Sequence, residues 1–288
     1  MSKNRSNSVS EDFLQGMAVA SAERLQVARA AIDPGELERR AAARPASPPL
    51  QLSTAGFDLI AEVKKSSPSA GQLAVATLSS AIQAGKYAAA GAAAISVLTE
   101  PSRFAGSLID LEQVVTQVTN IPVMRKDFLV DPYQVVEARA AGAGGVLLIA
   151  AILEPEMLRE MLQTAFDLGM FVLVEAFDEP DLLRCIPVMD EQLPALNNDG
   201  ACRMLLGINC RNLRTLEVEF MRFKQLAAQL PETIPWVAES GVNAPDQAAL
   251  VASAGYRLAL VGTALMRSAE PTEVAQALIQ AGRAARQP

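Results

Sequence analysis

The chain has 288 residues, 50% of them hydrophobic, which is enough to bury one large core and fits a single α/β barrel. Its formal net charge of −7 argues against nucleic acid and against an anionic membrane surface as partners. Because the chain has no histidine, Ser-His-Asp catalysis, Cys-His catalysis and histidine-ligated zinc are excluded, and proton transfer must use Lys, Glu, Asp, Tyr, Cys or water.

No stretch of the sequence has the pattern of an export signal or a membrane span. Residues 1–13 are polar and lack the charged and then apolar order of a secretory signal. The longest weakly polar run, residues 142–153, is shorter than the roughly 20 residues that a spanning helix needs. Cys185, Cys202 and Cys210 show no C-x-x-C spacing, and we interpret them as reduced thiols of a cytoplasmic protein.

The first expected element is a helical extension. Residues 18–43 have the composition of a helix, interrupted only at Asp33-Pro34-Gly35, and a proline-rich stretch follows over residues 45–50. We therefore expect a helical extension with its linker over residues 1–50 and a catalytic barrel domain over residues 51–288.

From residue 57 onward, short apolar runs alternate with amphipathic segments. Several runs are apolar without alternation, as in parallel strands that are buried on both faces. The expected strands are residues 57–61, 92–98, 121–124, 145–149, 171–174, 204–208, 236–238 and 258–261. The expected helices are residues 78–90, 110–118, 132–141, 154–168, 179–188, 217–230, 244–254 and 271–285. Eight such pairs predict a single (β/α)8 TIM barrel with an N-terminal helical extension, rather than an open doubly wound sheet.

Two connections stand out from this alternation. Residues 189–203 lengthen the connection before the sixth strand, and we expect a surface loop on the face of the barrel opposite the active site. Residues 65–73, after the first strand, are small, polar and punctuated by Pro and Gly. This composition predicts a mobile loop over the barrel mouth, the opening at the carboxyl ends of the strands, with a plain surface turn as the alternative.

Ionisable or amide side chains end five of the expected strands. Active sites of such barrels lie at the carboxyl ends of the strands, where these side chains must converge. Residues two apart on a strand project to the same side, so Glu62 and Lys64 belong together, as do Asn209 and Arg211. The strand-end residues are Glu62, Lys64, Lys126, Glu175, Asn209, Arg211, Glu239 and Ser240.

Two cations and an acid follow one another at the end of the third strand. Lys126 is predicted to face the mouth, since it follows that strand directly. Its neighbours Arg125 and Asp127 are expected to point outward and to pair with adjacent strand ends or helices.

Glycines after the last two strands favour an anion site. Backbone N–H groups at Gly241, Gly262 and Thr263 can bind a phosphate at a helix start, and many barrels hold phosphate after these strands. Ser67 or Ser69 could also reach the phosphate. The alternative is that Thr263 is an ordinary helix N-cap.

The chain resembles the indole-3-glycerol phosphate synthase family. The segments that carry the resemblance include IAEVKKSSPSAG, ISVLTEPSRFAGS, PVMRKDFLVDPYQVVEARAAGA, LVEAFDE, GINCRNLRTLEVE, AESGV and VGTALMR, in the family's order over residues 60–267. The N-terminal extension also resembles the family's extra helix near the barrel mouth.

This resemblance implies a carbon–carbon lyase (carboxy-lyase) of tryptophan biosynthesis. Its substrate is 1-(o-carboxyphenylamino)-1-deoxyribulose 5-phosphate, and ring closure, decarboxylation and dehydration give indole-3-glycerol phosphate. The resemblance implies no metal and no organic cofactor. The partner is thus a small phosphorylated molecule, and we expect a monomer or a weak homodimer.

The resemblance also implies roles for the ionisable residues. Lys126 is the general acid at the substrate carbonyl or departing hydroxyl, and Glu175 is the general base. Lys64 lies beside the phosphate and carboxylate, and either lysine could give the proton of the dehydration step. Glu62 positions the lysines and the substrate hydroxyls. Glu239 supports Lys64 or Lys126.

The remaining implied contacts hold the substrate. Asn209 and Ser240 hold its hydroxyls and its anthranilate part, and Arg211 orients a carboxylate partner. The phosphate is contacted by Ser67, Gly241, Gly262 and Thr263. The aromatic ring is sandwiched by Phe104 and Phe128.

Two positions depart from the family pattern. The chain has Phe177 where the family usually shows His and Cys210 where it shows Asn or Ser, and we expect altered packing rather than lost activity. These departures leave open a specialised paralogue that acts on a modified anthranilate-derived substrate in a biosynthetic cluster. A non-catalytic paralogue would have lost Lys126 or Glu175. Phosphoribosylanthranilate isomerase and the tryptophan synthase alpha subunit lack the EVK, RKDF and INxRNL set.

Overall fold

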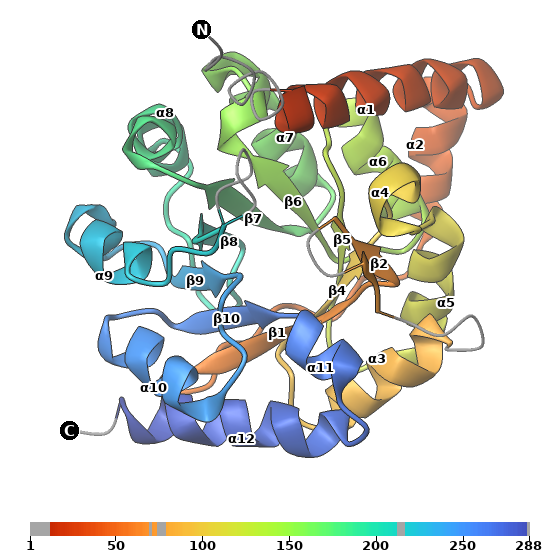
Figure 1. Cartoon of the computed structure of the whole chain (residues 1–288). Coiled ribbons are helices and arrows are strands. Elements are labelled where there is room, and N and C mark those ends of the chain that lie inside the picture. Colours follow the sequence, from red (N-terminus) through yellow and green to blue (C-terminus); the bar gives the residue numbers. More distant parts are fainter. Residues whose placement is uncertain (1–11, 69–70, 74–78, 212–216, 287–288) are drawn as a thin grey trace, which may run out of the picture.

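Eight parallel strands close into a barrel. The computed structural model describes residues 12–68, 71–73, 79–211 and 217–286 (Figure 1). Around the barrel the strands follow the order β1-β10-β9-β8-β7-β6-β5-β4. They are β1 (Asp58–Val63), β4 (Ala94–Leu98), β5 (Val123–Lys126), β6 (Gly145–Ile149), β7 (Phe171–Ala176), β8 (Met204–Asn209), β9 (Trp236–Glu239) and β10 (Leu258–Val261). The predicted (β/α)8 barrel is confirmed.

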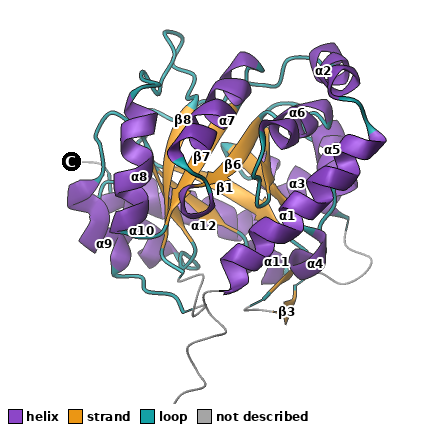
Figure 2. Ribbon diagram, turned by 90° about the horizontal axis from the view of Figure 1, so that it is seen from above, coloured by secondary structure: helices purple, strands orange, loops and turns teal. Residues whose placement is uncertain are grey.

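Helices surround the strands, as the view from above shows (Figure 2). The main ones are α3 (Ser80–Ala89), α5 (Leu108–Gln117), α6 (Pro132–Ala140), α7 (Pro155–Asp167), α8 (Glu179–Asp190), α9 (Arg222–Leu226), α10 (Pro245–Ser253) and α12 (Pro271–Ala284). Short pieces add α4 (Pro101–Phe104), α11 (Thr263–Arg267) and the 3₁₀ turns η1 (Ala150–Ile152) and η2 (Ala227–Gln229). No helix in the described ranges is long and apolar enough to cross a membrane.

The outer and inner faces of the barrel strands pack into two different hydrophobic cores. The larger core packs the helices against the outward side chains of the strands. The smaller one fills the lower barrel interior with residues such as Ile60, Met124 and Leu147. Along each strand the inward positions alternate with outward ones, so the next inward positions toward the mouth are free for polar side chains.

Two expected segments differ in the structure. The helix expected over residues 217–230 is shorter: α9 spans Arg222–Leu226 and continues only as η2, while Val218 pairs with Arg211 in an isolated bridge. The loop expected over residues 65–73 contains a small antiparallel pair, β2 (Ser66–Ser67) with β3 (Gly71–Gln72). Ser69 lies outside the described residues.

The connection over residues 189–203 is more than the expected surface loop. After α8 it folds back on itself through a Leu196–Cys202 bridge and pairs with the linker through a Gln51–Ala201 bridge. The Cys202 N–H donates to the Leu50 carbonyl at 2.8 Å, and both residues are buried. The segment therefore closes the end of the barrel opposite the mouth.

The N-terminal extension forms two helices, α1 (Asp12–Ala31) and α2 (Pro34–Ala43). The expected interruption is a helix cap, since the Asp33 side chain accepts from the N–H groups of Gly35 and Glu36. Leu25 and Leu37 pack on Tyr133 of α6. The Tyr133 hydroxyl lies 3.0 and 2.9 Å from the carbonyl oxygens of Ala28 and Ile32, so it holds the end of α1.

Tyr133→Phe should weaken this docking. The change removes one hydrogen bond to the end of α1, worth about 1 kcal/mol in the free energy of unfolding. For a chain of this size we expect the melting temperature to fall by roughly 2–4 °C in differential scanning calorimetry. An unchanged melting temperature would show that this hydroxyl does not stabilise the extension.

Candidate active site

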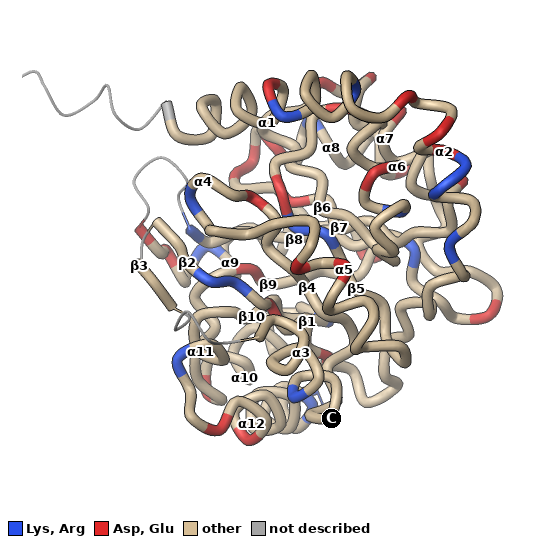
Figure 3. Tube along the Cα trace, turned by 90° about the vertical axis from the view of Figure 1, so that its right-hand side faces the viewer, with Lys and Arg blue, Asp and Glu red and all other residues tan. Residues whose placement is uncertain are grey.

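A cavity of about 820 Å³ opens at the carboxyl ends of the strands. Its volume is that of a small-molecule site. Figure 3 shows Lys and Arg positions interspersed with Asp and Glu positions along the chain, and one such pair, Lys126 of β5 with Glu175 of β7, lies in this cavity. All the site residues predicted from the sequence line this cavity: Glu62, Lys64, Ser67, Phe104, Lys126, Phe128, Glu175, Asn209, Arg211, Glu239, Ser240, Gly241, Gly262 and Thr263. Their individual roles stay predictions.

The strands run further than the apolar runs suggested, and this places the polar side chains. Glu62, Lys126 and Glu175 stay within the ladder as the last or next-to-last residues of their strands, and so do Asn209 and Glu239. Glu62, Lys126, Glu175 and Glu239 occupy inward positions because each lies two residues beyond an inward apolar residue, and Asn209 lies four residues beyond the inward Leu205. The closed barrel therefore brings them together above the apolar interior.

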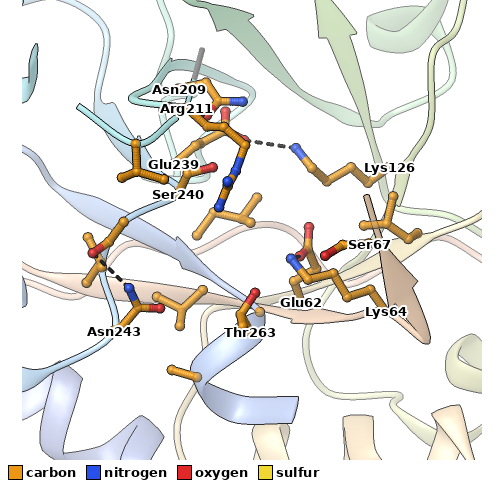
Figure 4. Close-up of a pocket in the computed structure, with 18 of the residues that line it drawn as sticks. Glu62, Lys64, Ser67, Lys126, Asn209, Arg211, Glu239, Ser240, Asn243 and Thr263 are labelled. Atoms are coloured by element: carbon orange, nitrogen blue, oxygen red, sulfur yellow. Dashed lines mark hydrogen bonds and ion pairs between the residues drawn. The ribbon is translucent and has the colours of Figure 1, made fainter. Parts of the chain in front are cut away.

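Lys126 is the centre of this polar layer (Figure 4). Its Nζ lies 3.1 Å from Oε2 of Glu175 and 2.9 Å from Oε2 of Glu239. Asn209 Nδ2 donates to the other oxygen of Glu175 at 3.2 Å. The carboxylate side chains are 4% and 2% exposed, so these charges interact with little screening by water. Glu239 thus pairs with Lys126 rather than with Lys64.

Burial and charge set different pKa values for the three groups. Burial alone would lower the pKa of Lys126, but the nearby carboxylates outweigh it and raise that pKa above its ordinary value. Burial opposes ionisation of Glu175, yet the Lys126 charge and the hydrogen bonds to Glu175 lower its pKa. Burial and the Glu175 charge raise the pKa of Glu239 to about 8, against attraction by Lys126.

Two glycines make room for the carboxylates. A Cβ at Gly207, on β8 beside β7 and β9, would overlap the Glu239 carboxylate. A Cβ at Gly262 would overlap Glu62 in the same way. Gly207 was missed by the sequence analysis, although a glycine inside a strand marks a close approach.

The other side of the cavity offers groups for an anion. Lys64 Nζ lies 2.6 Å from Oε1 of Glu62 and its side chain is 15% exposed. Ser240 and Gly241 both have positive φ, 65° and 75°, so the chain turns sharply after β9. The α11 helix is preceded by Gly262 as N-cap, so the alternative that Thr263 is the N-cap is wrong.

Three phenylalanines form an apolar wall. The Phe104 and Phe128 ring centroids are 6.2 Å apart and tilted by 35°, and Phe13 of α1 meets Phe128 edge-on at 6.3 Å. A ring stacked between two others needs their centroids roughly 7 Å apart, twice the contact distance. In this conformation the rings are therefore one wall rather than two faces. Phe13 was missed, although it lies one helical turn before Met17, which is buried.

Arg125 and Asp127 make the expected pairs with a helix and an adjacent strand end, although Asp127 also borders the cavity. Arg125 contacts Glu137 of α6 at 2.7 Å and Asp127 at 3.2 Å. The Thr99 hydroxyl donates to Asp127 at 2.8 Å. The expected pairing of both side chains is therefore confirmed.

The two departures from the family pattern lie behind the cavity wall. The Phe177 ring stacks under the Arg222 guanidinium at 4.0 Å. The buried Cys210 thiol donates to the Ser240 carbonyl at 3.4 Å, beneath the turn after β9. Burial raises the pKa of Cys210 to about 12, so the thiol is not a nucleophile at neutral pH. In the described part of the chain, no three His, Cys, Asp or Glu residues form a group that could hold a metal ion.

This barrel holds an ammonium between two carboxylates, has glycine turns after its last strands and has an aromatic wall. These features are those of enzymes that bind small molecules at the barrel mouth. A solved structure of 3-hexulose-6-phosphate synthase from Salmonella typhimurium has the same fold, with a TM-score of 0.58 at 12% identity, and covers 78% of this chain and 98% of that one.

The sequence comparisons are more specific. The family model for indole-3-glycerol phosphate synthase matches residues 17–278. An indole-3-glycerol phosphate synthase from a Nocardioides species is 42% identical over 92% of this chain and 95% of its own. Indole-3-glycerol phosphate synthase 1 from Streptomyces coelicolor is also 42% identical, over 96% of each chain. The chain belongs to the indole-3-glycerol phosphate synthase family.

The raised pKa of Glu239 can be measured directly. In a ¹³C NMR titration of glutamate carboxyl groups, we expect one carboxyl to titrate near pH 8, because Glu239 is buried beside the charged Glu175. Glu239→Gln keeps the hydrogen bonding of a neutral acid and should abolish this titration without unfolding the protein. A titration that persists in the variant would assign it to another carboxyl group, and its absence from the wild type would contradict the assignment.

Proposed function

We propose that this protein is an indole-3-glycerol phosphate synthase, a carboxy-lyase of tryptophan biosynthesis. The reaction converts 1-(o-carboxyphenylamino)-1-deoxyribulose 5-phosphate into indole-3-glycerol phosphate, CO₂ and water. The observation that carries the proposal is the Lys126 ammonium, held between two buried carboxylates and facing a cavity with a separate polar and apolar end. Family membership supports the same activity.

The chemistry needs an acid that stays protonated next to a base. Ring closure joins the carboxylated ring carbon to the ketone carbon of the sugar, whose oxygen must take up a proton. We assign that proton to Lys126, because Glu175 and Glu239 stabilise its charged form. Loss of CO₂ from the ring carbon follows. Dehydration then requires protonation of the departing hydroxyl and removal of a proton as the indole becomes aromatic.

Glu175 is the proposed base for that last proton. Its pKa is lowered, so it is ionised when the substrate enters, and Asn209 fixes one of its oxygens at 3.2 Å. Glu239, whose pKa is raised by burial and by the Glu175 charge, would support Lys126 from 2.9 Å away. A lysine and two glutamates with different pKa values thus serve acid–base chemistry without histidine.

Two ends of the cavity suit the two ends of the substrate. We assign the phosphate to Lys64, Ser67 and the backbone of Gly241, Gly262 and Thr263, and the anthranilate ring to the phenylalanine wall. Lys64 provides local positive charge at the phosphate end, although the net charge of the whole protein is −7. Asn209, Ser240 and Arg211 would hold the hydroxyls and the carboxylate between these ends, with Glu62 orienting Lys64.

The proposal includes the setting of the enzyme. We place it in the cytoplasm as a monomer or weak homodimer that binds a small phosphorylated substrate. The helical extension over residues 1–50 and the barrel over residues 51–288 would act together, because Phe13 reaches the cavity from α1.

The purified protein should form indole-3-glycerol phosphate, detected by its indole fluorescence, at the same rate with and without EDTA. Lys126→Met keeps a side chain of similar length but cannot give a proton, so turnover should fall by at least ~10²-fold. Circular dichroism would verify that the variant is folded. No product from the wild type, or near-normal turnover by the folded variant, would refute the proposed function or the role of Lys126 respectively.

Glu175→Gln separates proton transfer from binding. Glutamine keeps the size and the contact with Asn209 but is not basic, so kcat should fall by about 10²–10⁴-fold while KM changes little. If Glu175 only held Lys126 in place, KM for the anionic substrate would rise along with any loss in kcat. Steady-state kinetics of the variant decide between a base and a charge partner.

A further inference from the structure

Arg24 of α1 joins two buried carboxylates that belong to different parts of the barrel mouth. Its guanidinium lies 2.8 Å from Oδ1 of Asp127, just after β5, and 3.5 Å from Oε1 of Glu100, just before α4. The Asp127 and Glu100 side chains are 1% and 0% exposed, while Arg24 is 28% exposed. One cation from the extension therefore reaches two acids that water scarcely reaches.

Each of these carboxylates holds one phenylalanine of the apolar wall. Glu100 is the N-cap of α4, and it accepts hydrogen bonds from the backbone N–H groups of Arg103 at 2.7 Å and Phe104 at 3.2 Å. Asp127 accepts a hydrogen bond from the backbone N–H of Phe128 at 2.9 Å. The relative position of the two rings thus depends on two carboxylates that share one guanidinium.

The same cluster is connected to Lys126. The Thr99 N–H donates to the Lys126 carbonyl at 3.0 Å, and the Thr99 hydroxyl donates to Asp127 at 2.8 Å. Arg125 balances the other oxygen of Asp127 at 3.2 Å. Without Arg24, Asp127 would keep the Arg125 contact but Glu100 would lose the cation 3.5 Å from it, and the surrounding chain can relieve such a loss by moving.

We propose that Arg24 is a positioning residue that sets the spacing of Phe104 and Phe128 and so determines the affinity for the aromatic end of the substrate. Arg24 is not among the residues that line the cavity, and it acts through Asp127 and Glu100. The inference rests on the proposed function for the identity of the aromatic group. Gly241, Gly262 and Thr263 of the phosphate end lie on the loops after β9 and β10, outside this cluster, whereas Ser67 of β2 lies beside α4.

Arg29 provides a matched control on the same helix. Its guanidinium also lies 2.8 Å from an aspartate after β5, Asp131, and also ties α1 to the barrel. Asp131 caps α6 through the Tyr133 N–H and does not line the cavity, and the pair is more exposed, at 44% and 18%. A general loosening of α1 should therefore appear in both variants, and loss of ring positioning only in the Arg24 variants.

The test compares Arg24→Gln, Arg24→Lys and Arg29→Gln in the full chain. Anthranilate serves as a probe of the ring end and inorganic phosphate as a probe of the phosphate end, both measured by direct titration and as inhibitors of turnover. We expect Arg24→Gln to weaken anthranilate binding and lower kcat/KM by about tenfold or more, mainly through KM, since small misplacements of binding groups have large effects. The affinity for phosphate should change by less than about threefold, because a site that is not coupled to Arg24 is little affected by its loss.

The controls separate positioning from stability. Arg24→Lys keeps the charge but lacks the fork that spans two carboxylates, so it should recover only part of the anthranilate affinity. Arg29→Gln should leave anthranilate affinity within about twofold, as expected of an exposed ion pair. If Arg24→Gln does not fold, Arg24→Lys alone carries the comparison with Arg29→Gln.

Two outcomes would overturn the inference. One is equal effects of Arg24→Gln and Arg29→Gln on anthranilate binding, and the other is an equal loss of anthranilate and phosphate binding in Arg24→Gln. Failure of this inference can be told apart from failure of the proposed function. A wild-type protein without turnover would refute the proposed function, and direct titration with anthranilate and phosphate would still test the role of Arg24.

Discussion

The Lys126 ammonium between Glu175 and Glu239 is the interaction on which the cavity depends. Transferring such groups out of water costs several kcal/mol for each ion, and only close pairing and further hydrogen bonds offset that cost. The barrel provides both, because β5, β7 and β9 end at the same height and the side chains of Lys126, Glu175 and Glu239 point inward. Any displacement of β5, β7 or β9 would leave one of these charges without its partner. The chemistry therefore depends on how accurately the barrel is closed.

This requirement also explains features that lie beside the charged groups. Gly207 is needed because a larger residue would occupy the space of the Glu239 carboxylate. Gly262 serves Glu62 in the same way, and it is also the N-cap of α11. The apolar interior below, with Ile60 and Met124, excludes water from beneath the polar layer. A single inward position on each strand thus separates the packing that stabilises the barrel from the groups that react.

Much of this could be predicted from the sequence, and the exceptions have physical causes. The strand–helix alternation predicted the barrel because parallel strands buried on both faces are continuously apolar. The strand ends were placed too early, since Glu175 and Asn209 are polar yet remain in the ladder. The helix expected over residues 217–230 is α-helical only over Arg222–Leu226, because composition alone does not reveal that Val218 pairs with Arg211.

The site was predictable where residues belong to strands and less so where distant segments contribute. Glu62, Lys126 and Glu239 follow from strand ends that must converge. Phe13 and Arg24 come from α1, and nothing local in the sequence indicates which side of the mouth that helix covers. The distance between Phe104 and Phe128 depends on that docking, so their arrangement as one wall could not be inferred from spacing.

The clasp between the linker and the segment after α8 has a consequence for the order in which the chain matures during synthesis. Leu50 and Gln51 leave the ribosome early, but their partners Ala201 and Cys202 follow about 150 residues later. The contacts at the start of β1 form later still, because Arg283 of α12 binds the Phe57 carbonyl and the Asp58 carboxylate. Contacts so distant along the chain are slow to form. The nascent protein must therefore hold its first strand unpaired on one edge until nearly the whole chain has been made.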